Sequence, residues 1–384
     1  MTAPWYRRAT AKVPERPKAM ARRLRHRLRQ RRRPAGPAPG ELRAVVYLPT
    51  WARWDVMRQR PQYLMKAFAG AGHPAYFVDP REPGPRTVDG VQIVRTIDEV
   101  PRSGVILYVH FAPLRELFDA FDDPAIVYDI HDDLTIYEPD EVGMAPERTV
   151  AAHHGAMVAA ADVTVVSLDV LAERHRHEAP DLLVVENGVD TEAFRRRTEP
   201  PGDLPVVDGP IVGYHGALSY WFDFALVEAV ARSRPSWSFV LVGPVLEPAA
   251  RHAARLSELE NVTVLGERPS DEIPAYVQRF DVGLIPFRLD TMTEAVSPLK
   301  MYESLAAGVP VVSTPLPAAI ATAGVRTASG SSAFAAAIDA ALADRDDPGF
   351  RAAATREADE AEWGTRIRPV LERLDELGRR RVPR

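Results

Sequence analysis

The sequence predicts an α/β protein with two similar domains, each a parallel sheet covered by helices on both faces. From Arg43 onward, short runs rich in β-branched residues alternate with segments of helical period, a pattern typical of wound parallel sheets. The 384 residues exceed one ordinary hydrophobic core, which favours two domains. The composition, 46% hydrophobic and 26% charged, is that of a globular protein.

The first domain is expected to span residues 41–205, after a basic tail and linker over 1–40. A helix with one buried stripe should follow its first strand, formed by Tyr63, Leu64, Ala67 and Phe68. Its strands are expected at 43–48, 75–78, 105–109, 125–128, 163–166 and 182–185.

Four prolines in 199–210 end this pattern, and a second βα series is expected over 206–350. A second helical stripe consists of Phe222, Leu226, Val227 and Val230, and strands are expected at 211–214, 238–242, 262–265, 282–285 and 309–313. Two such domains predict a cleft between them, where ligands usually bind. The charged segment 351–384 is expected to be a helical surface layer.

Charge is unevenly distributed along the chain. Residues 1–40 carry thirteen Lys or Arg and one acidic residue, so this tail has a charge of +12 and the remainder −17, for a net charge of −5. Residues 7–33 could dock on an anionic membrane surface or on nucleic acid, or form a solvated extension. The acidic body argues against extended contact with nucleic acid.

Cysteine is absent, which excludes disulfides, thiolate metal sites and a cysteine nucleophile. The sequence has neither an apolar run of the ~18–20 residues that a membrane span needs nor the apolar core of a signal peptide. We therefore expect a cytoplasmic protein, with a peripheral location on the inner membrane face if the tail binds lipid.

The most informative segment runs from Ser297 to Pro310. Ser297 as N-cap followed by proline predicts a helix start, and Gly308 with Pro310 predicts its end. The free amides of Leu299 and Lys300, with the Lys300 ammonium, suit a diphosphate.

Glu303 lies one turn further on the same face, where its carboxylate can accept hydrogen bonds from a ribose diol. In the alternative interpretation Ser297 only caps the helix, and Glu303 pairs with Lys300.

The run 297–314 resembles the donor-binding segment of bacterial GT-B glycosyltransferases related to family 4, including teichuronic-acid-type enzymes. The resemblance also covers 211–217, 221–223, 235–243, 261–266 and 281–287, with weaker matches back to about residue 44. It implies two Rossmann-like domains facing across a cleft, and transfer of a sugar from a nucleoside diphosphate sugar to an acceptor hydroxyl. The product would be a cell-surface polysaccharide or glycolipid. The family's first glutamate is replaced by Ala295, which leaves the sugar and the stereochemistry open.

Further donor-side candidates follow from the same resemblance. Gly213, His215 and Gly216 follow a strand and allow close approach of the backbone to a ligand, or they form a tight turn. Asp223 is a candidate in the same group, and Arg288 is a supplementary phosphate contact or a solvated arginine.

Candidate catalytic residues lie in the first domain, just past the expected strand 125–128. Asp132 is the first choice to take the acceptor proton, followed by Asp133 or His131, unless the three form a turn that caps a helix. The aspartates, with Asp129, could instead bind a divalent metal. The resemblance argues against an essential metal, and no cofactor beyond the nucleotide-sugar co-substrate is expected.

Arg58 and Arg60 resemble the family's acceptor-side loop and suit an anionic, lipid-linked acceptor, or they are surface arginines. The Asn187-Gly-Val-Asp190 stretch matches the family near the cleft, or it is a turn. Two other functions remain open on the sequence: a sugar-nucleotide epimerase, and a non-catalytic nucleotide- or glycan-binding protein tethered by its tail.

Overall fold

A computed structural model describes residues 34–36, 43–50, 52–136, 145 and 148–381. They form two compact units. Unit 1 consists of the described residues of Met1–Glu186 and Arg366–Arg384, and unit 2 of Asn187–Thr365. The basic segment 7–33, predicted to meet an anionic surface, lies outside the described residues.

Unit 1 contains an eight-stranded sheet in the order β3-β4-β2-β1-β5-β6-β7-β8. Neighbouring strands are parallel except for the antiparallel pair β3 and β4. The order reverses between β1 and β5, so this is the topological switch point, where open α/β sheets place ligands. The strands are β1 (Ala44–Tyr47), β2 (Ala75–Val78), β3 (Arg86–Val88), β4 (Val91–Val94), β5 (Val105–Val109), β6 (Ala125–Ile130), β7 (Val163–Val166) and β8 (Leu183–Val184).

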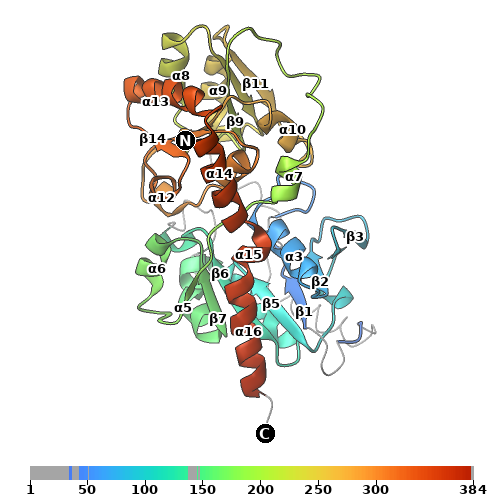
Figure 1. The fold of residues 1–384 in the computed structure, drawn as a ribbon. Helices are drawn as coiled ribbons and strands as arrows, with labels where there is room; N and C mark the ends of the chain where they lie inside the picture. Colours follow the sequence, from blue (N-terminus) through green and yellow to red (C-terminus); the bar gives the residue numbers. More distant parts are fainter. Residues whose placement is uncertain (1–33, 37–42, 51, 137–144, 146–147, 382–384) are drawn as a thin grey trace. The chain divides into compact units, whose positions relative to one another are not determined.

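Helices of unit 1 cover this sheet (Figure 1). The predicted stripe is confirmed in α3, where Tyr63, Leu64 and Phe68 are buried and Ala67 is half-buried. The helices are α3 (Arg60–Gly70), α5 (Val150–Ala160), α6 (Asp169–His175) and α16 (Arg368–Arg381), with short 3-10 turns at Ile97–Glu99, Ala112–Ala120 and Leu134–Ile136.

Unit 2 contains a six-stranded parallel sheet in the order β11-β10-β9-β12-β13-β14, with its switch point between β9 and β12. The strands are β9 (Ile211–His215), β10 (Ser238–Val242), β11 (Val262–Gly266), β12 (Val282–Ile285), β13 (Val311–Ser313) and β14 (Val325–Thr327). All five strands predicted for this region are present. The sequence missed β3 and β14, because short edge strands with exposed side chains lack a continuous apolar run. It also missed β4, an inner strand whose short run of buried residues is interrupted by the exposed Gln92.

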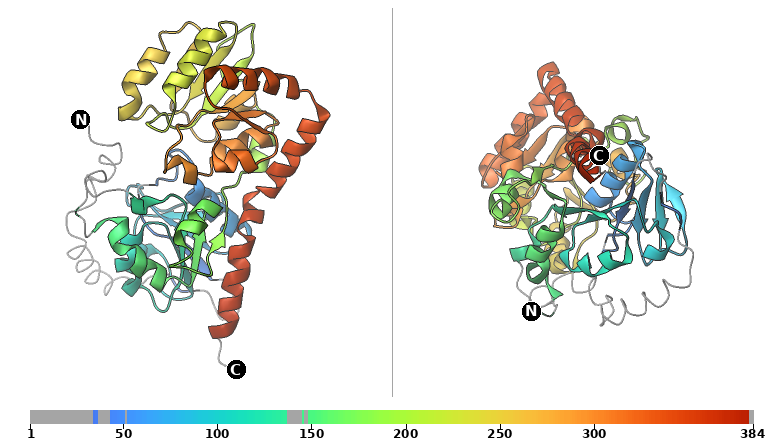
Figure 2. Two further views of the ribbon diagram at one scale, coloured as in Figure 1. Left: turned by 90° about the vertical axis from the view of Figure 1, so that its left-hand side faces the viewer. Right: turned by 90° about the horizontal axis from the view of Figure 1, so that it is seen from below.

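Helices of unit 2 include α8 and α13, which lie side by side (Figures 1 and 2). The predicted stripe at Phe222, Leu226, Val227 and Val230 is buried. The helices are α7 (Thr191–Arg195), α8 (Phe224–Ser233), α9 (Ala250–Leu256), α10 (Ile273–Val277), α11 (Leu299–Ala306), α12 (Pro317–Ala321), α13 (Ser331–Asp344) and α14 (Pro348–Glu360), with 3-10 turns at Glu247–Ala249 and Thr293–Ala295; α15 (Trp363–Arg366) spans the boundary between the units.

The predicted domain limits need two corrections. Unit 1 ends at Glu186 rather than at 205, because α7 packs on α10 and α11 of unit 2. The segment 351–384 is not one layer: α14 packs on α11 in unit 2, whereas α16 contacts β7 in unit 1 (Figure 2). Proline-rich composition near 199–210 therefore marks a loop within unit 2 rather than a boundary.

Among the described residues, none of the helices combines the length and the apolar character needed to cross a membrane.

Candidate active site

The start of α11 lies in unit 2, on the crossover between β12 and β13. The helix begins at Leu299, with Pro298 as its N-cap residue and without a side-chain cap. The prediction that Ser297 caps the helix is therefore wrong, because proline holds the capping position. Asn187 Nδ2 instead donates to the Ser297 carbonyl oxygen at 2.6 Å and so anchors the helix start.

Two groups at this helix start are suited to an anion. Ser297 is buried, and its Oγ makes no hydrogen bond within the part of the chain that the structure describes. The N–H groups of Leu299 and Lys300 belong to the first turn, where a helix provides no internal acceptor. Together they form a donor-rich, electropositive corner.

His215 and Glu303 meet beside this corner. His215 ends β9 and Glu303 lies on α11; His215 Nε2 is 2.8 Å from Glu303 Oε2, and both side chains are buried. The sequence predicted both residues but not their contact. The alternative interpretation paired Glu303 with Lys300 instead. The β9 carboxyl end and α11 thus place an imidazole and a carboxylate together at the switch point.

Lys300 completes the group. Its Nζ lies 4.8 Å from the ring centre of Phe287 and 5.5 Å from that of Tyr214, distances typical of cation–π contacts. Burial lowers the pKa of Lys300 to about 8, although the charge of Glu303 acts in the opposite direction. Gly216 has φ +122°, and a Cβ there would lie 3.0 Å from Lys300 Cε, so only glycine lets this lysine lie against the loop.

Other donor-side candidates have structural roles. Gly213 lies inside β9, where a Cβ would come within 2.1 Å of the Phe280 ring, so it is a packing glycine. Asp223 Oδ1 accepts from Leu226 N at 2.9 Å and caps α8. Arg288 is exposed after β12. Packing accounts for Gly213 and helix capping for Asp223, and the predicted phosphate contact of Arg288 stays a prediction.

In unit 1, His131 and Asp132 follow β6 and pair with each other. His131 Nε2 is 3.2 Å from Asp132 Oδ2, and the Asp132 side chain is 41% exposed. Burial opposes protonation of His131, but the charge and hydrogen bond of Asp132 outweigh it, so the pKa of His131 is raised. Burial also opposes ionisation of Asp132, but His131 lowers its pKa overall. Asp132 is therefore an accessible, ionised carboxylate held by an imidazole.

Asp133 points elsewhere. Its Oδ1 accepts from the Thr135 amide at 3.2 Å, and its Oδ2 lies 3.1 Å from Arg174 Nη1. Burial opposes its ionisation, but the nearby His175 ring and the bonds from Thr135 and Arg174 hold its pKa well below the ordinary value. The turn-capping alternative is correct for Asp133, and a proton-accepting role is not supported.

The acceptor-side arginines are both paired. Arg60 bridges Asp129, with Nε to Oδ2 at 2.8 Å and Nη2 to Oδ1 at 3.1 Å, and both side chains are 2% exposed. Arg60 is therefore buried and paired, which contradicts its predicted role in binding the acceptor. Asp129 is occupied by the same pair, so it is not available as a metal ligand. Arg58 Nη2 lies 3.0 Å from Asp89 Oδ2 near the surface.

Sequence reasoning missed His110, which directly follows β5 and lies beside His131, with ring centres 4.8 Å apart. Tyr47 hydrogen-bonds the His110 ring. Burial, and then the charge of His131, hold the pKa of His110 well below its ordinary value. The signal was a histidine directly after a buried strand, at the same sheet edge as His131.

Comparison with known proteins agrees with this geometry. Residues 209–344 match the family Glycosyl transferases group 1, and this stretch contains the His215, Lys300 and Glu303 group. Over 136 residues the chain is 35% identical to TuaH of Bacillus subtilis (strain 168), whose name places it among glycosyltransferases of teichuronic acid biosynthesis. That match covers 35% of this chain and about a third (34%) of TuaH.

Solved structures resemble most of the chain. Sucrose-phosphate synthase from Thermosynechococcus elongatus matches with a TM-score of 0.62 and 16% identity, covering 88% of this chain and 99% of that one. Anabaena HepE, solved with UDP and glucose, matches with a TM-score of 0.60 and 15% identity over 87% and 99%. Trehalose 6-phosphate synthase from Burkholderia multivorans matches with a TM-score of 0.61 and 14% identity, covering 89% of this chain and 100% of that one. At these identities the likeness shows the fold: the chain has the GT-B glycosyltransferase fold.

Proposed function

We propose that the protein is a glycosyltransferase that moves a sugar from a nucleoside diphosphate sugar to an acceptor hydroxyl. The observation that carries the proposal is the convergence of His215, Lys300 and Glu303 at the start of α11, inside the stretch that matches the group 1 family. A helix start with a half-buried lysine and a buried carboxylate provides separate contacts for phosphate and for ribose.

The donor-binding roles follow from these positions. The amides of Leu299 and Lys300, the Ser297 hydroxyl and the Lys300 ammonium bind the diphosphate. Glu303, held by His215, accepts hydrogen bonds from the ribose hydroxyls. These donors and the helix dipole neutralise the phosphates, so donor binding needs no metal ion.

In the transfer step, the acceptor oxygen forms a bond to the anomeric carbon as the bond from that carbon to the diphosphate breaks. The nucleoside diphosphate leaves with the electron pair, and Asp132 takes the proton of the acceptor hydroxyl. His131 holds the Asp132 carboxylate at 3.2 Å. The reaction therefore needs no redox partner.

The acceptor is a glycan or lipid-linked glycan of the cell envelope. The similarity to a protein named for teichuronic acid biosynthesis supports this setting. Residues 7–33, with their high positive charge, would hold the cytoplasmic enzyme on an anionic inner membrane face. We expect salt-sensitive binding to vesicles containing anionic lipid, and its loss on deletion of 1–40; equal binding by the shortened chain would contradict this.

The first experiment is a thermal-shift screen of UDP, GDP, ADP, CMP and their sugars, with and without EDTA. One nucleotide class should stabilise the protein in both conditions. Glu303→Ala should lose the shift, since removal of hydrogen bonds to a charged group weakens binding by about 10–100-fold. Glu294→Ala is the matched control, because Glu294 is exposed in the preceding 3-10 turn.

Product analysis with the stabilising donor then tests the reaction. A glycosylated acceptor, formed only when donor and acceptor are both present, supports the proposal. An epimerised sugar formed without acceptor, or binding without turnover by the wild-type protein, would overturn it.

A further inference from the structure

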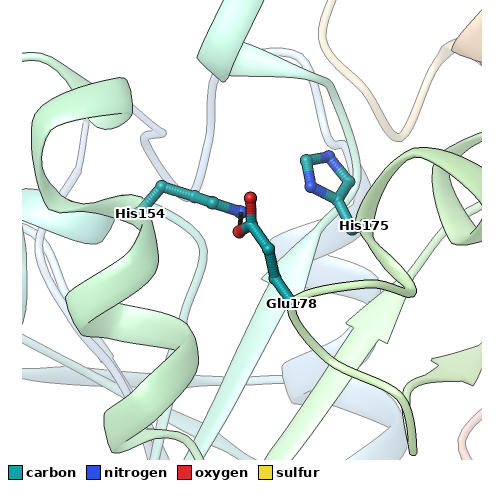
Figure 3. A group of neighbouring side chains, drawn as sticks. All are labelled: His154, His175 and Glu178. Atoms are coloured by element: carbon teal, nitrogen blue, oxygen red, sulfur yellow. Dashed lines mark ion pairs between the residues drawn. The ribbon is translucent and has the colours of Figure 1, made fainter.

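Three side chains of the kind that bind metal ions lie together in unit 1, at positions well after Asp132 in the sequence and outside the donor site. His154 comes from α5, His175 ends α6, and Glu178 follows in the next loop (Figure 3). One nitrogen or oxygen from each lies within 4.8 Å of the others. Both histidines are buried and Glu178 is partly exposed.

His154 is oriented by a neighbour. Its Nδ1 is 3.0 Å from the Tyr128 hydroxyl, a contact that orients the ring so that Nε2 faces Glu178. Nε2 lies 2.9 Å from Glu178 Oε2, yet it makes no hydrogen bond within the described part of the chain. One ring nitrogen held by an outer partner, with the other nitrogen directed at the ligand position, is the arrangement that metal-ligating histidines usually have.

His175 supplies the second orphan nitrogen. Its Nε2 is buried without a hydrogen bond among the described residues, and its nearest carboxylate partner, Asp133 Oδ1, is 3.7 Å away. A buried ring nitrogen without a partner carries an unfavourable free energy of desolvation. A bound cation between the two imidazoles and Glu178 would satisfy both nitrogens.

The three side chains line a cavity of about 410 Å³ with Asp133, Arg174 and His177. The space admits an ion and the waters that complete its coordination. Arg174 does not oppose a cation strongly, because its charge is balanced by Asp133 at 3.1 Å. Since the chain contains no cysteine, ligation must come from nitrogen and oxygen.

We propose that His154, His175 and Glu178 bind one divalent zinc-type ion. Two imidazoles and one carboxylate are a donor set that Zn²⁺ prefers, with water in the remaining positions. The ion would join α5 to the end of α6. Through Asp133, which contacts His175 and Arg174, it would also steady the loop that carries Asp132.

The test titrates the full chain with ZnCl₂ against a chromophoric chelator and records the absorption of the Co²⁺ form. We expect one ion per chain, a low-coordinate Co²⁺ spectrum without a thiolate band, and a lower Tm after EDTA. His154→Gln and Glu178→Gln should each weaken Zn²⁺ binding by at least about tenfold. Glu178 is partly exposed, so its variant should fold even if the His154 variant does not.

His177→Gln is the matched control, because His177 lies in the same loop but its side chain is 71% exposed. His252→Gln, on unit 2, controls for surface histidines. Zn²⁺ binding that survives in both ligand variants, or is lost only in His177→Gln, would overturn the site, as would absence of stoichiometric binding. Nucleotide stabilisation in EDTA is measured separately, so failure of this site is distinguishable from failure of the donor site.

Discussion

The carboxyl edges of the two sheets both hold a buried pair of polar side chains, but the pairs differ in kind. In unit 1, Arg60 and Asp129 satisfy each other with two hydrogen bonds, and the Tyr108 hydroxyl adds a third to Asp129 at 2.9 Å. In unit 2, His215 and Glu303 share one contact beside Lys300, a polar serine and a helix start. The first pair is saturated by protein groups, whereas the second is surrounded by groups suited to a ligand.

This comparison shows that burial of a polar pair does not by itself identify a functional site. A buried pair whose hydrogen-bonding capacity is filled acts as scaffold, because loss of one partner leaves an uncompensated charge. A pair that lies at a sheet switch point among other hydrogen-bond donors can contact a ligand bound there.

The largest effect should arise at the exposed carboxylate of unit 1. Asp132→Asn removes the proton acceptor and should lower turnover by about 10²–10⁴-fold, with donor binding unchanged in thermal shift. Asp181→Asn, at an exposed position of the same unit, should keep wild-type turnover in the same assay. If Asp132→Asn retained full activity, unit 1 would not supply the proton acceptor.

The scaffold role of the saturated pair can be tested by unfolding. Arg60→Leu should lower the free energy of unfolding by about 3–5 kcal/mol, because Asp129 remains buried and charged. Arg58→Leu should change it by about 1 kcal/mol or less, since its pair with Asp89 is partly exposed. Urea titration measures both; unchanged stability in Arg60→Leu together with a raised KM for acceptor would restore its acceptor role.

Gly216 tests the contact between the β9 loop and Lys300. Gly216→Ala should destabilise the protein by about 1–3 kcal/mol and weaken nucleotide binding, because a Cβ at positive φ meets Lys300. Gly202→Ala, where a Cβ has no neighbour within 4 Å, should be close to neutral. Equal Tm values for the two variants would argue against a constrained loop.

The smallest effect concerns pH. The pKa of Lys300 is about 8 in the folded protein and near its ordinary value when unfolded, so nucleotide affinity should fall as pH rises through about 8. Between about 8 and the ordinary value the unfolded chain binds more protons, so the contribution of Lys300 to the free energy of unfolding should rise with pH. Lys300→Arg should abolish both trends, which calorimetry at pH 7 and 9 can measure; an unchanged affinity profile in this variant would exclude Lys300 as the titrating group.

Local pattern predicted the strands that run through the sheet centres because each is a short apolar run bounded by turns, as at 105–109 and 238–242. Edge strands such as β14 were not predicted, since half-exposed residues carry little periodic signal. The helix at 299–306 was predicted from proline and glycine positions, although its capping residue was off by one. Boundary errors of this size arise because capping depends on backbone angles that composition does not reveal.

The sequence alone determined that this chain forms two α/β units, and that Lys300 and Glu303 share one helix face at a phosphate-type helix start. Only the tertiary structure decided the partners: His215 against Glu303, Arg60 against Asp129, His154 against Glu178. Periodicity reports which face of an element is buried, because it reflects spacing along one element. Which charges meet depends on strand order, and strand order brings together residues that are far apart along the chain.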